Sequence, residues 1–283
     1  MINLLNKFKQ LTSNSNSFLF LFLGFNSIKL YQISADLKIQ LLNLLLSSGI
    51  FFLLEDRNKK IEVFRKDKRL IRYFGISLFL IIFARSLYLT TAQDKFYYFL
   101  LPSGIFSILL IIYESKDLNF YKNILNICLL LPLRRLFVYL LDFILLPVTK
   151  YLTWIILFSI GKEPILIDES IFINRSELII GNACLGSDNL FFVICSVYIY
   201  SIILKLKNYQ NIRIIAFITI IVPLLINVFR NVLLALIVSF EFNYKDDMFY
   251  FFHDSYGSVL FSLVSVSIVS KVYFSLLNSE LKN

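Results

Sequence analysis

The sequence predicts an all-α polytopic membrane protein with a small β element in its C-terminal half, and three observations support this fold class. The 283-residue chain is 58% hydrophobic and 17% aromatic. Most of its apolar residues lie in long blocks, and a helix needs about 20 mainly apolar residues to cross a bilayer. The segment 162–182 instead alternates short branched triplets with polar residues. We therefore expect about eight transmembrane helices in one integral-membrane domain, residues 1–283.

Eight apolar segments are the candidate spans, and the first two are short enough to form an N-terminal hairpin. In chain order they are Phe18–Tyr31, Ile39–Leu54, Ile71–Ala92, Tyr97–Tyr113, a long region within Ile124–Ile160, Leu190–Leu204, Ile214–Phe240 and Gly257–Val272. The chain has no long repeat and no Pro/Gly-rich linker. We divide its single domain into N-terminal spans, residues 1–120, and a C-terminal region, residues 121–283, that carries the chemistry.

The net charge of +9 is explained by membrane topology and does not indicate nucleic-acid binding. Segment Glu55–Arg72 has eight Lys or Arg against four Asp or Glu, and loop Lys205–Arg213 has three basic residues and no acidic one. The positive-inside rule places both in the cytoplasm. The acidic loop Glu241–Tyr256 then lies outside, beyond the span that separates the two loops. Lys7 and Lys9 without a cleavage pattern predict a retained, cytoplasmic N-terminus.

The segment 162–182 predicts a small β element and not a span. Its triplets Ile165–Ile167, Ile171–Ile173 and Leu178–Ile180 are separated by polar turn residues, as short strands are. Open strand edges are not tolerated in lipid, so the element should lie in water or against protein. It leads into Cys184, and we place it on the extracytoplasmic side.

Three reactive side chains lie in the last hundred residues: Cys184, Arg230 and the only histidine, His253. The topology above places all three in the outer part of the bilayer. A thiol, a guanidinium and an imidazole on one water-facing rim can supply a nucleophile, a charge stabiliser and an acid/base. This combination predicts a membrane-embedded cysteine peptidase or transpeptidase.

The neighbours of these residues support the chemistry. Cys184 precedes a helix, whose N-terminus favours a thiolate, and Gly186 would let a substrate backbone approach closely. Arg230 lies deep in an apolar stretch, on the same helical face as Asn227, and could hold a thiolate or an oxyanion. His253 can act as acid and base, with Asp254 adjacent to it.

Each side chain also has an ordinary structural explanation. Cys184 could be a small buried hydrophobe, Arg230 a snorkelling or ion-paired arginine, and His253 an interfacial histidine bonded to backbone. Their coincidence at one level of the membrane favours a shared function. Three scattered cysteines predict no disulfide framework, and one histidine with dispersed carboxylates predicts no metal site and no cofactor.

The region Ile124–Ile160 leaves the topology open. It contains Pro132, Arg134 and Arg135 among apolar residues. One crossing with an amphipathic or re-entrant piece keeps Cys184 on the outer side, whereas two full crossings would move it to the cytoplasm. The two arginines are either functional, as intramembrane charges often are, or simply mark a helix end.

Several short motifs resemble the exosortase/archaeosortase family of membrane cysteine transpeptidases, most clearly across about Pro132–Gly257. They are Pro132-Leu133-Arg134-Arg135-Leu136, Ala183-Cys184-Leu185-Gly186, Asn227-Val228-Phe229-Arg230 and His253-Asp254-Ser255-Tyr256-Gly257. Their order and spacing make the set fairly specific, whereas the N-terminal third adds only hydropathy. The family typically has Cys-Ser-Gly or Cys-Ala-Gly, so Leu185 puts the subfamily in question and leaves the thiol in place.

The resemblance implies substrates that are secreted proteins with a C-terminal sorting signal: a short motif, often of the Pro-Glu-Pro type in bacteria (PEP-CTERM), then a hydrophobic span and a basic end. By this analogy Cys184 attacks the scissile amide, Arg230 stabilises the thiolate or the oxyanion, and His253 protonates the leaving amine and then activates an acceptor. The acceptor would be a lipid or a surface glycan.

From the resemblance we also expect Gly186, Asn227 and Asp254 to contact the substrate. The enzyme would be a multi-pass protein of the inner or plasma membrane, surrounded by membrane lipids, with its active site facing the extracytoplasmic side. No nucleic-acid partner is expected.

Rival interpretations remain open at this point. A protease that only hydrolyses, or an acyltransferase, could use the same thiol. A transporter or an assembly subunit for surface polysaccharide would tolerate Cys184→Ser, but it would also predict interrupted helices in paired halves, which the sequence does not have. A homologue that has lost activity is disfavoured because all three reactive side chains are present.

Overall fold

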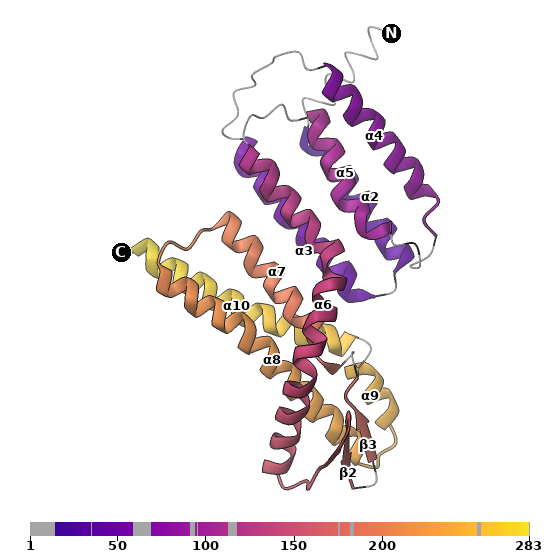
Figure 1. Cartoon of the computed structure of the whole chain (residues 1–283), viewed down its shortest axis with the longest axis vertical. Coiled ribbons are helices and arrows are strands. Elements are labelled where there is room, and N and C mark those ends of the chain that lie inside the picture. The colour runs from indigo at the N-terminus through magenta and orange to yellow at the C-terminus, as the bar shows by residue number, and fades with distance from the viewer. Residues whose placement is uncertain are drawn as a thin grey trace. The chain divides into compact units, whose positions relative to one another are not determined.

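The computed structural model (Figure 1) describes residues 15–34, 36–58, 69–90, 94, 96–112, 118–174, 176–181, 184–253 and 256–282. Within these ranges it contains helices α2 to α10 and one three-stranded sheet, which confirms the predicted all-α polytopic fold class. The N-terminal residues with Lys7 and Lys9, most of the basic segment Glu55–Arg72, and Asp254 lie outside the described residues.

Each of the eight predicted apolar segments coincides with one helix. These helices are α2 (Ser15–Ile33), α3 (Leu37–Asn58), α4 (Arg69–Leu87), α5 (Tyr97–Ile112), α6 (Leu118–Ser159), α7 (Ser187–Ile203), α8 (Tyr209–Ser239) and α10 (Tyr256–Lys282). Four described stretches are long and apolar enough to cross a membrane: Leu70–Leu87, Lys122–Ser159, Tyr209–Ser239 and Tyr256–Lys282. Three further apolar helices are shorter, so the number of crossings stays a prediction.

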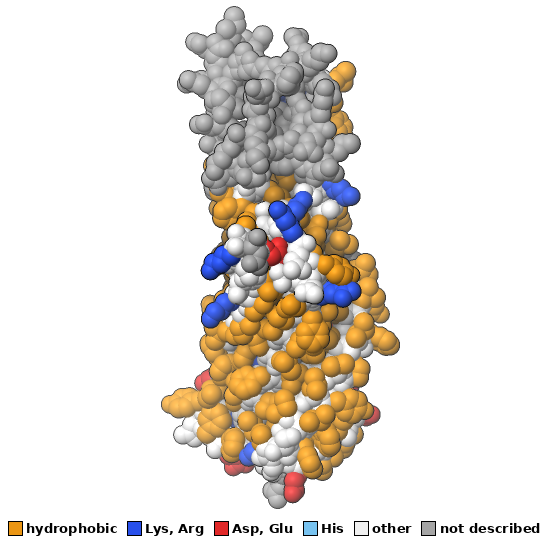
Figure 2. Space-filling model, turned by 90° about the vertical axis from the view of Figure 1, so that its left-hand side faces the viewer, with side chains coloured by type: hydrophobic (Ala, Val, Ile, Leu, Met, Phe, Trp, Pro, Cys, Tyr) orange, Lys and Arg blue, Asp and Glu red, His pale blue; other side chains and the backbone are white. Residues whose placement is uncertain are grey.

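Large apolar side chains cover much of the outside of these helices. Phe143 of α6, Phe229 of α8 and Leu260 of α10 are all more than half exposed. Figure 2 shows hydrophobic side chains spread over a broad face, with Lys and Arg side chains gathered above it and Asp and Glu side chains near its lower end. Such extensive apolar exposure is unusual for soluble proteins and is typical of a surface that contacts lipid.

Helix α6 is one uninterrupted helix of 42 residues. At 1.5 Å per residue it is about 63 Å long, roughly twice the hydrocarbon thickness of a bilayer. Because it has no turn, it contains neither the re-entrant piece nor the two-crossing hairpin that the sequence left open. The chain divides into two compact units, Met1–Leu133 and Arg134–Asn283, and the boundary lies one residue beyond Pro132, which cannot donate a helical hydrogen bond.

The N-terminal unit consists mainly of α2 to α5. Helix α5 packs against α4 and α2, and α2 also packs against α3. The α2–α3 contact contains a buried polar pair, because Asn26 Nδ2 donates to Asn43 Oδ1 at 2.7 Å. Asn43 Nδ2 donates in turn to Ser27 Oγ at 3.1 Å. Hydrogen bonds of this kind join helices inside a membrane, where burial of apolar surface no longer drives association.

The C-terminal unit is built around α7, α8 and α10, which pack pairwise and lie side by side in Figure 1. At one end of this group, Glu280 near the end of α10 accepts hydrogen bonds from the backbone N–H groups of Lys207 (2.7 Å) and Asn208 (3.1 Å). These donors precede α8, so the carboxylate helps to cap the α8 N-terminus. The other end of the group carries Cys184 and His253.

The predicted β element is present as an antiparallel sheet with strand order β1-β2-β3. The strands are β1 (Ile165–Ile167), β2 (Ser170–Ile173) and β3 (Ser176–Ile179), so the third begins two residues earlier than the apolar triplet suggested. Asp168 and Asn174 turn the chain with positive φ values of 49° and 56°, a conformation that Asp and Asn tolerate better than most residues. Trp154 Nε1 of α6 donates to the carbonyl of Pro164 at 2.8 Å and fixes the sheet to the helix.

One predicted loop is a helix. The sequence predicts an acidic loop over Glu241–Tyr256, but helix α9 (Lys245–His253) lies within this segment. Asp246 and Asp247 lie in its first turn, where carboxylates interact favourably with the positive end of the helix dipole. Nine residues are too short for a stable isolated helix, so α9 depends on its tertiary contacts with α8 and α10.

Candidate active site

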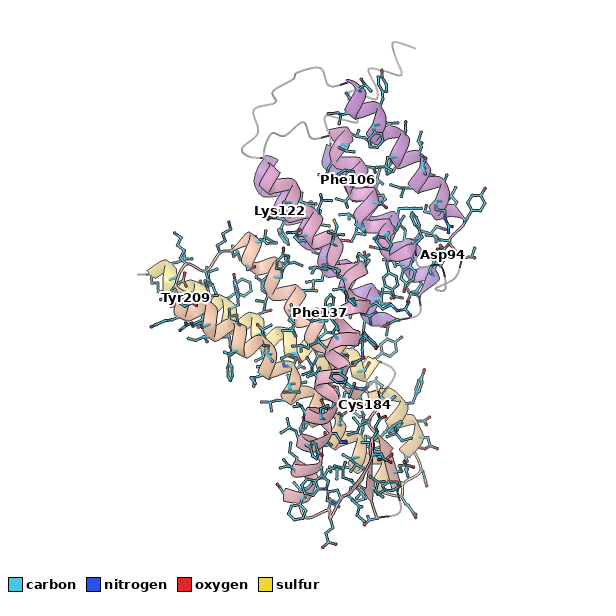
Figure 3. All side chains as sticks on the ribbon, in the orientation of Figure 1. Asp94, Phe106, Lys122, Phe137, Cys184 and Tyr209 are labelled. Atoms are coloured by element: carbon cyan, nitrogen blue, oxygen red, sulfur yellow. The ribbon has the colours of Figure 1, made fainter. Side chains whose placement is uncertain are left out.

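Cys184 lies in a buried turn between the sheet and α7 in the C-terminal unit. Its backbone N–H donates to the carbonyl of Gly181 at 2.8 Å, and Gly186 caps α7 in a left-handed conformation with φ 78°. The side chain is only 1% exposed and packs in an apolar cluster with residues of β2, β3, α7 and α8. Figure 3 shows Cys184 above the strands and next to α9.

The thiol of Cys184 and the imidazole of His253 are in contact. The distance from Sγ to Nε2 is 3.3 Å, although the residues are 69 positions apart in the sequence. The ring of His253, the last residue of α9, stacks on Phe249 one helical turn earlier, with 5.0 Å between centroids and 13° between planes. A thiol and an imidazole at this distance can exchange a proton, so the pair can generate a thiolate.

Arg230 connects α8 to the end of α9. Its Nε donates to the carbonyl of Phe252 at 2.9 Å and its Nη2 donates to the carbonyl of His253 at 2.6 Å. The last carbonyls of a helix have no intrahelical donor, and a guanidinium fork satisfies two of them with charge-assisted bonds. The role of Arg230 at a thiolate or an oxyanion stays a prediction; in the structure Arg230 binds the backbone of the histidine directly.

Two asparagines of α8 bind the backbone of Cys184. Asn227 Nδ2 and Asn231 Nδ2 donate to the same carbonyl oxygen, that of Cys184, at 2.7 and 2.8 Å. Asn227 was predicted from its place on the face of Arg230, whereas Asn231 was missed. Its signal in the sequence is weak: a second amide, four residues after the first, in an otherwise apolar helix.

Gly186 allows a close approach, and in the structure the approaching group is Asn227. A Cβ atom at position 186 would lie 2.4 Å from Asn227 Cγ, which no real packing permits. That Gly186 and Asn227 contact the substrate stays a prediction. Asp254, the third expected substrate contact, lies outside the described residues.

The two arginines of the Pro-Leu-Arg-Arg motif do not mark a helix end, because both lie inside α6. Arg134 Nη2 lies 2.8 Å from Asp188 Oδ1, in the first turn of α7. A ring contact between Phe137 and Phe191, with centroids 5.2 Å apart, continues this α6–α7 junction. The ion pair therefore anchors the start of the helix that follows Cys184.

In the part of the chain that the structure describes, no group of three or more His, Cys, Asp or Glu side chains could hold a metal ion. The chemistry carried by the described residues is a thiol beside an imidazole, with a guanidinium bonded to the backbone of the imidazole residue.

Comparison with known proteins identifies a family that the chain matches. A family model described as "Transmembrane exosortase (Exosortase_EpsH)" matches residues 18–270. The match extends well beyond the motifs of the C-terminal half and includes the N-terminal spans. No curated protein and no solved structure matches the chain significantly.

Proposed function

The chain belongs to the family of transmembrane exosortases, and we propose that it is a cysteine transpeptidase that removes the C-terminal sorting tail of secreted proteins. The observation that supports this most directly is the 3.3 Å contact between Cys184 Sγ and His253 Nε2. A nucleophile within hydrogen-bonding reach of a base is the arrangement that covalent catalysis requires.

In the first half of the reaction, His253 accepts the thiol proton and the thiolate of Cys184 attacks the scissile carbonyl carbon. A C–S bond forms, and the carbonyl electrons move to oxygen. When this tetrahedral intermediate collapses, the C–N bond breaks and the leaving amine takes the proton from His253. The products are a thioester on Cys184 and a released tail with its hydrophobic span and basic end.

In the second half, His253 accepts a proton from the acceptor as the acceptor attacks the thioester carbon. The C–S bond breaks, and the sulfur of Cys184 recovers the proton from the imidazolium. An amine or hydroxyl of a lipid or surface glycan gives transfer, whereas water gives hydrolysis. Both outcomes use the same residues, so the identity of the product distinguishes them.

Arg230 contributes in two ways under this proposal. Its hydrogen bonds to the carbonyls of Phe252 and His253 hold the imidazole in place. Its positive charge, buried beside the site, also stabilises negative charge that develops on sulfur or on the oxyanion. A buried guanidinium is costly in a membrane-spanning helix, and this cost is consistent with a functional role.

The orientation of the protein is also a proposal. The basic loop Lys205–Arg213 and the site lie at opposite ends of α8, and the positive-inside rule puts that loop in the cytoplasm. The thiol then faces the extracytoplasmic side, where the sorting motif of a secreted protein emerges from its hydrophobic span. Because Cys184 is buried, substrate binding must open a path to it.

The test compares the C-termini of secreted proteins in the native host with the wild-type protein and with Cys184→Ala. We expect several proteins to keep a hydrophobic, basic-ended tail only with the variant. The matched control is Cys195→Ala, a second buried cysteine eleven residues further on in α7, which should process normally. Unchanged C-termini with Cys184→Ala at normal protein level would refute the proposal and favour a transporter or assembly role.

A further inference from the structure

We propose that Asn227 and Asn231 form an amide clamp, the pair of α8 side chains that fixes the backbone of Cys184 and thereby positions its thiol. The clamp is a positioning device, because neither amide has a recorded contact with Sγ itself. This inference rests on the proposed function, since it assigns a role around the same nucleophile.

The clamp places two donors on one acceptor. Asn227 and Asn231 are four residues apart, so their side chains leave the same face of α8 on successive turns. Both Nδ2 groups reach the carbonyl oxygen of Cys184, at 2.7 and 2.8 Å. A carbonyl oxygen has two lone pairs, and the two amides engage both. Two fixed donors restrict the direction of the C=O bond far more than one would.

The clamp is fully enclosed. Asn227 is 3% exposed, Asn231 is 0% exposed and Cys184 is 1% exposed. The first backbone hydrogen bond of α7 runs from Leu190 N–H to the carbonyl of Gly186, so the carbonyl of Cys184 lies before the helix and takes its donors from side chains. A buried carbonyl that loses both donors has no water to replace them, and the turn has to rearrange.

Gly186 makes room for the clamp. Its φ of 78° already disfavours any residue with a side chain, and a Cβ there would lie 2.4 Å from Asn227 Cγ and 2.7 Å from Asn227 Nδ2. The glycine two residues after the cysteine is therefore needed by this chain's own packing. An added methyl group would displace the Asn227 amide from the carbonyl of Cys184.

Fixing this carbonyl fixes the nucleophile. The peptide unit is planar, so the clamped C=O fixes the peptide plane that follows the Cα atom of Cys184. The hydrogen bond from Cys184 N–H to the carbonyl of Gly181 at 2.8 Å fixes the plane that precedes it, and one side-chain torsion then remains to place Sγ. Arg230 lies between the two asparagines in the sequence and binds the carbonyls of Phe252 and His253. One turn of α8 therefore holds the backbone of both reacting residues and sets the 3.3 Å distance between Sγ and Nε2.

The test measures the reactivity of Cys184 in the full-length protein in detergent micelles. Iodoacetamide alkylates the thiolate by direct displacement of iodide and forms no oxyanion. Its rate therefore depends on the thiol, on its base and on opening of the buried site, and not on substrate binding. The rate at Cys184 is followed from pH 5 to pH 9 by mass spectrometry of the peptide that contains it. The variants are Asn227→Ala, Asn231→Ala and His253→Gln.

The matched control is Asn189→Ala. Asn189 is also a buried asparagine of the C-terminal unit, and its Nδ2 donates to the carbonyl of Pro223 at 3.3 Å and to Ser265 Oγ at 3.0 Å, away from Cys184. The Asn189→Ala variant shows how far the loss of any buried amide from the helix bundle changes the alkylation rate of Cys184. A second variant and its control leave every amide in place. Gly186→Ala displaces the Asn227 amide of the clamp, whereas its control Gly181→Ala adds a Cβ that has no other atom within 4 Å.

We expect Asn227→Ala, Asn231→Ala and Gly186→Ala to slow alkylation at pH 7 by about tenfold or more and to give the pH profile of His253→Gln, because the thiol no longer meets its base. Asn189→Ala and Gly181→Ala should stay near the wild-type rate. The clamp is refuted if the clamp variants are alkylated at the same rate as their controls and only His253→Gln is alkylated more slowly. If His253→Gln matches the wild type, the thiol–imidazole pair itself fails, and the clamp fails with it.

Discussion

The buried asparagines that contact Cys184 serve a different purpose from the pair between α2 and α3. In the N-terminal unit, Asn26 and Asn43 bond to each other and join two helices by their side chains. In the C-terminal unit, Asn227 and Asn231 bond to a backbone carbonyl in a turn, and Arg230 bonds to two more at a helix end. The first arrangement holds helices together, whereas the second holds backbone in place. Polar groups in the membrane therefore separate into those that secure the fold and those that place reacting atoms.

The strongest test of this distinction removes the nucleophile. Cys184→Ala should reduce tail processing by about a thousandfold or more, because the variant loses the thiol that contacts the chain's only histidine. The fold should be intact, since only one sulfur atom is lost from an apolar cluster. Processing is measured by pulse labelling of a secreted protein with a sorting tail. Substantial processing by this variant would remove Cys184 from the mechanism.

Replacing the base comes next. His253→Gln should slow processing by about a hundredfold to ten-thousandfold, the range expected for loss of a general acid/base. Glutamine keeps a polar side chain at the end of α9 but cannot shuttle the proton. The measurement is the single-turnover rate of thioester formation. A rate near that of the wild type would show that the 3.3 Å contact is incidental.

Arg230→Lys tests whether charge alone is enough. Lysine keeps the positive charge but not the fork that reaches the carbonyls of Phe252 and His253, so we expect processing to fall by about tenfold or more. Amide hydrogen exchange across Lys245–His253 should also become faster, because α9 loses its anchor. The control is Arg213→Lys, an exposed arginine of α8 that lies over the ring of Tyr209. Unchanged exchange in α9 with Arg230→Lys would limit Arg230 to an electrostatic role.

The smallest effect is expected in the N-terminal unit. Asn43→Ala removes both α2–α3 hydrogen bonds of this side chain and should lower the unfolding free energy by about 1 kcal/mol, the magnitude found for hydrogen bonding between membrane helices. Unfolding in mixed detergent micelles gives the value. The alkylation rate of Cys184 should not change, in contrast with Asn231→Ala. Slower alkylation in Asn43→Ala would mean that the two groups of asparagines do not act separately.

Much of the fold was predictable because its determinants are local. The length and hydropathy of each apolar segment predict a helix, and the branched triplets before Cys184 predict the strands. Local features also explain two failures: α9 was predicted as a loop, and the course of the chain through 124–160 was left undecided. Helix α9 is only nine residues long, and the prolines and arginines within 124–160 imitate helix ends although α6 continues through them.

The candidate site was only partly predictable. Cys184, Arg230 and His253 were identified because reactive side chains at the edges of apolar blocks are conspicuous. Asn231 was not, since nothing in the sequence of α8 says that its amide meets a carbonyl 47 residues earlier in the chain. The hydrogen bonds of Arg230 to the carbonyls of Phe252 and His253 were not predicted either, because the end of α9 could not be placed before α9 itself was known.

The amino-acid sequence is enough to identify a helical membrane protein with a thiol, a guanidinium and an imidazole near one end of its C-terminal helices. These are properties of segment length, hydropathy and residue type, which act within a few turns of the chain. The 3.3 Å contact between Sγ and Nε2, and the hold of one turn of α8 on the backbone of both residues, depend on how the helices pack. Hydrogen bonds act over about 3 Å, so their partners are set by how helices distant in sequence pack together.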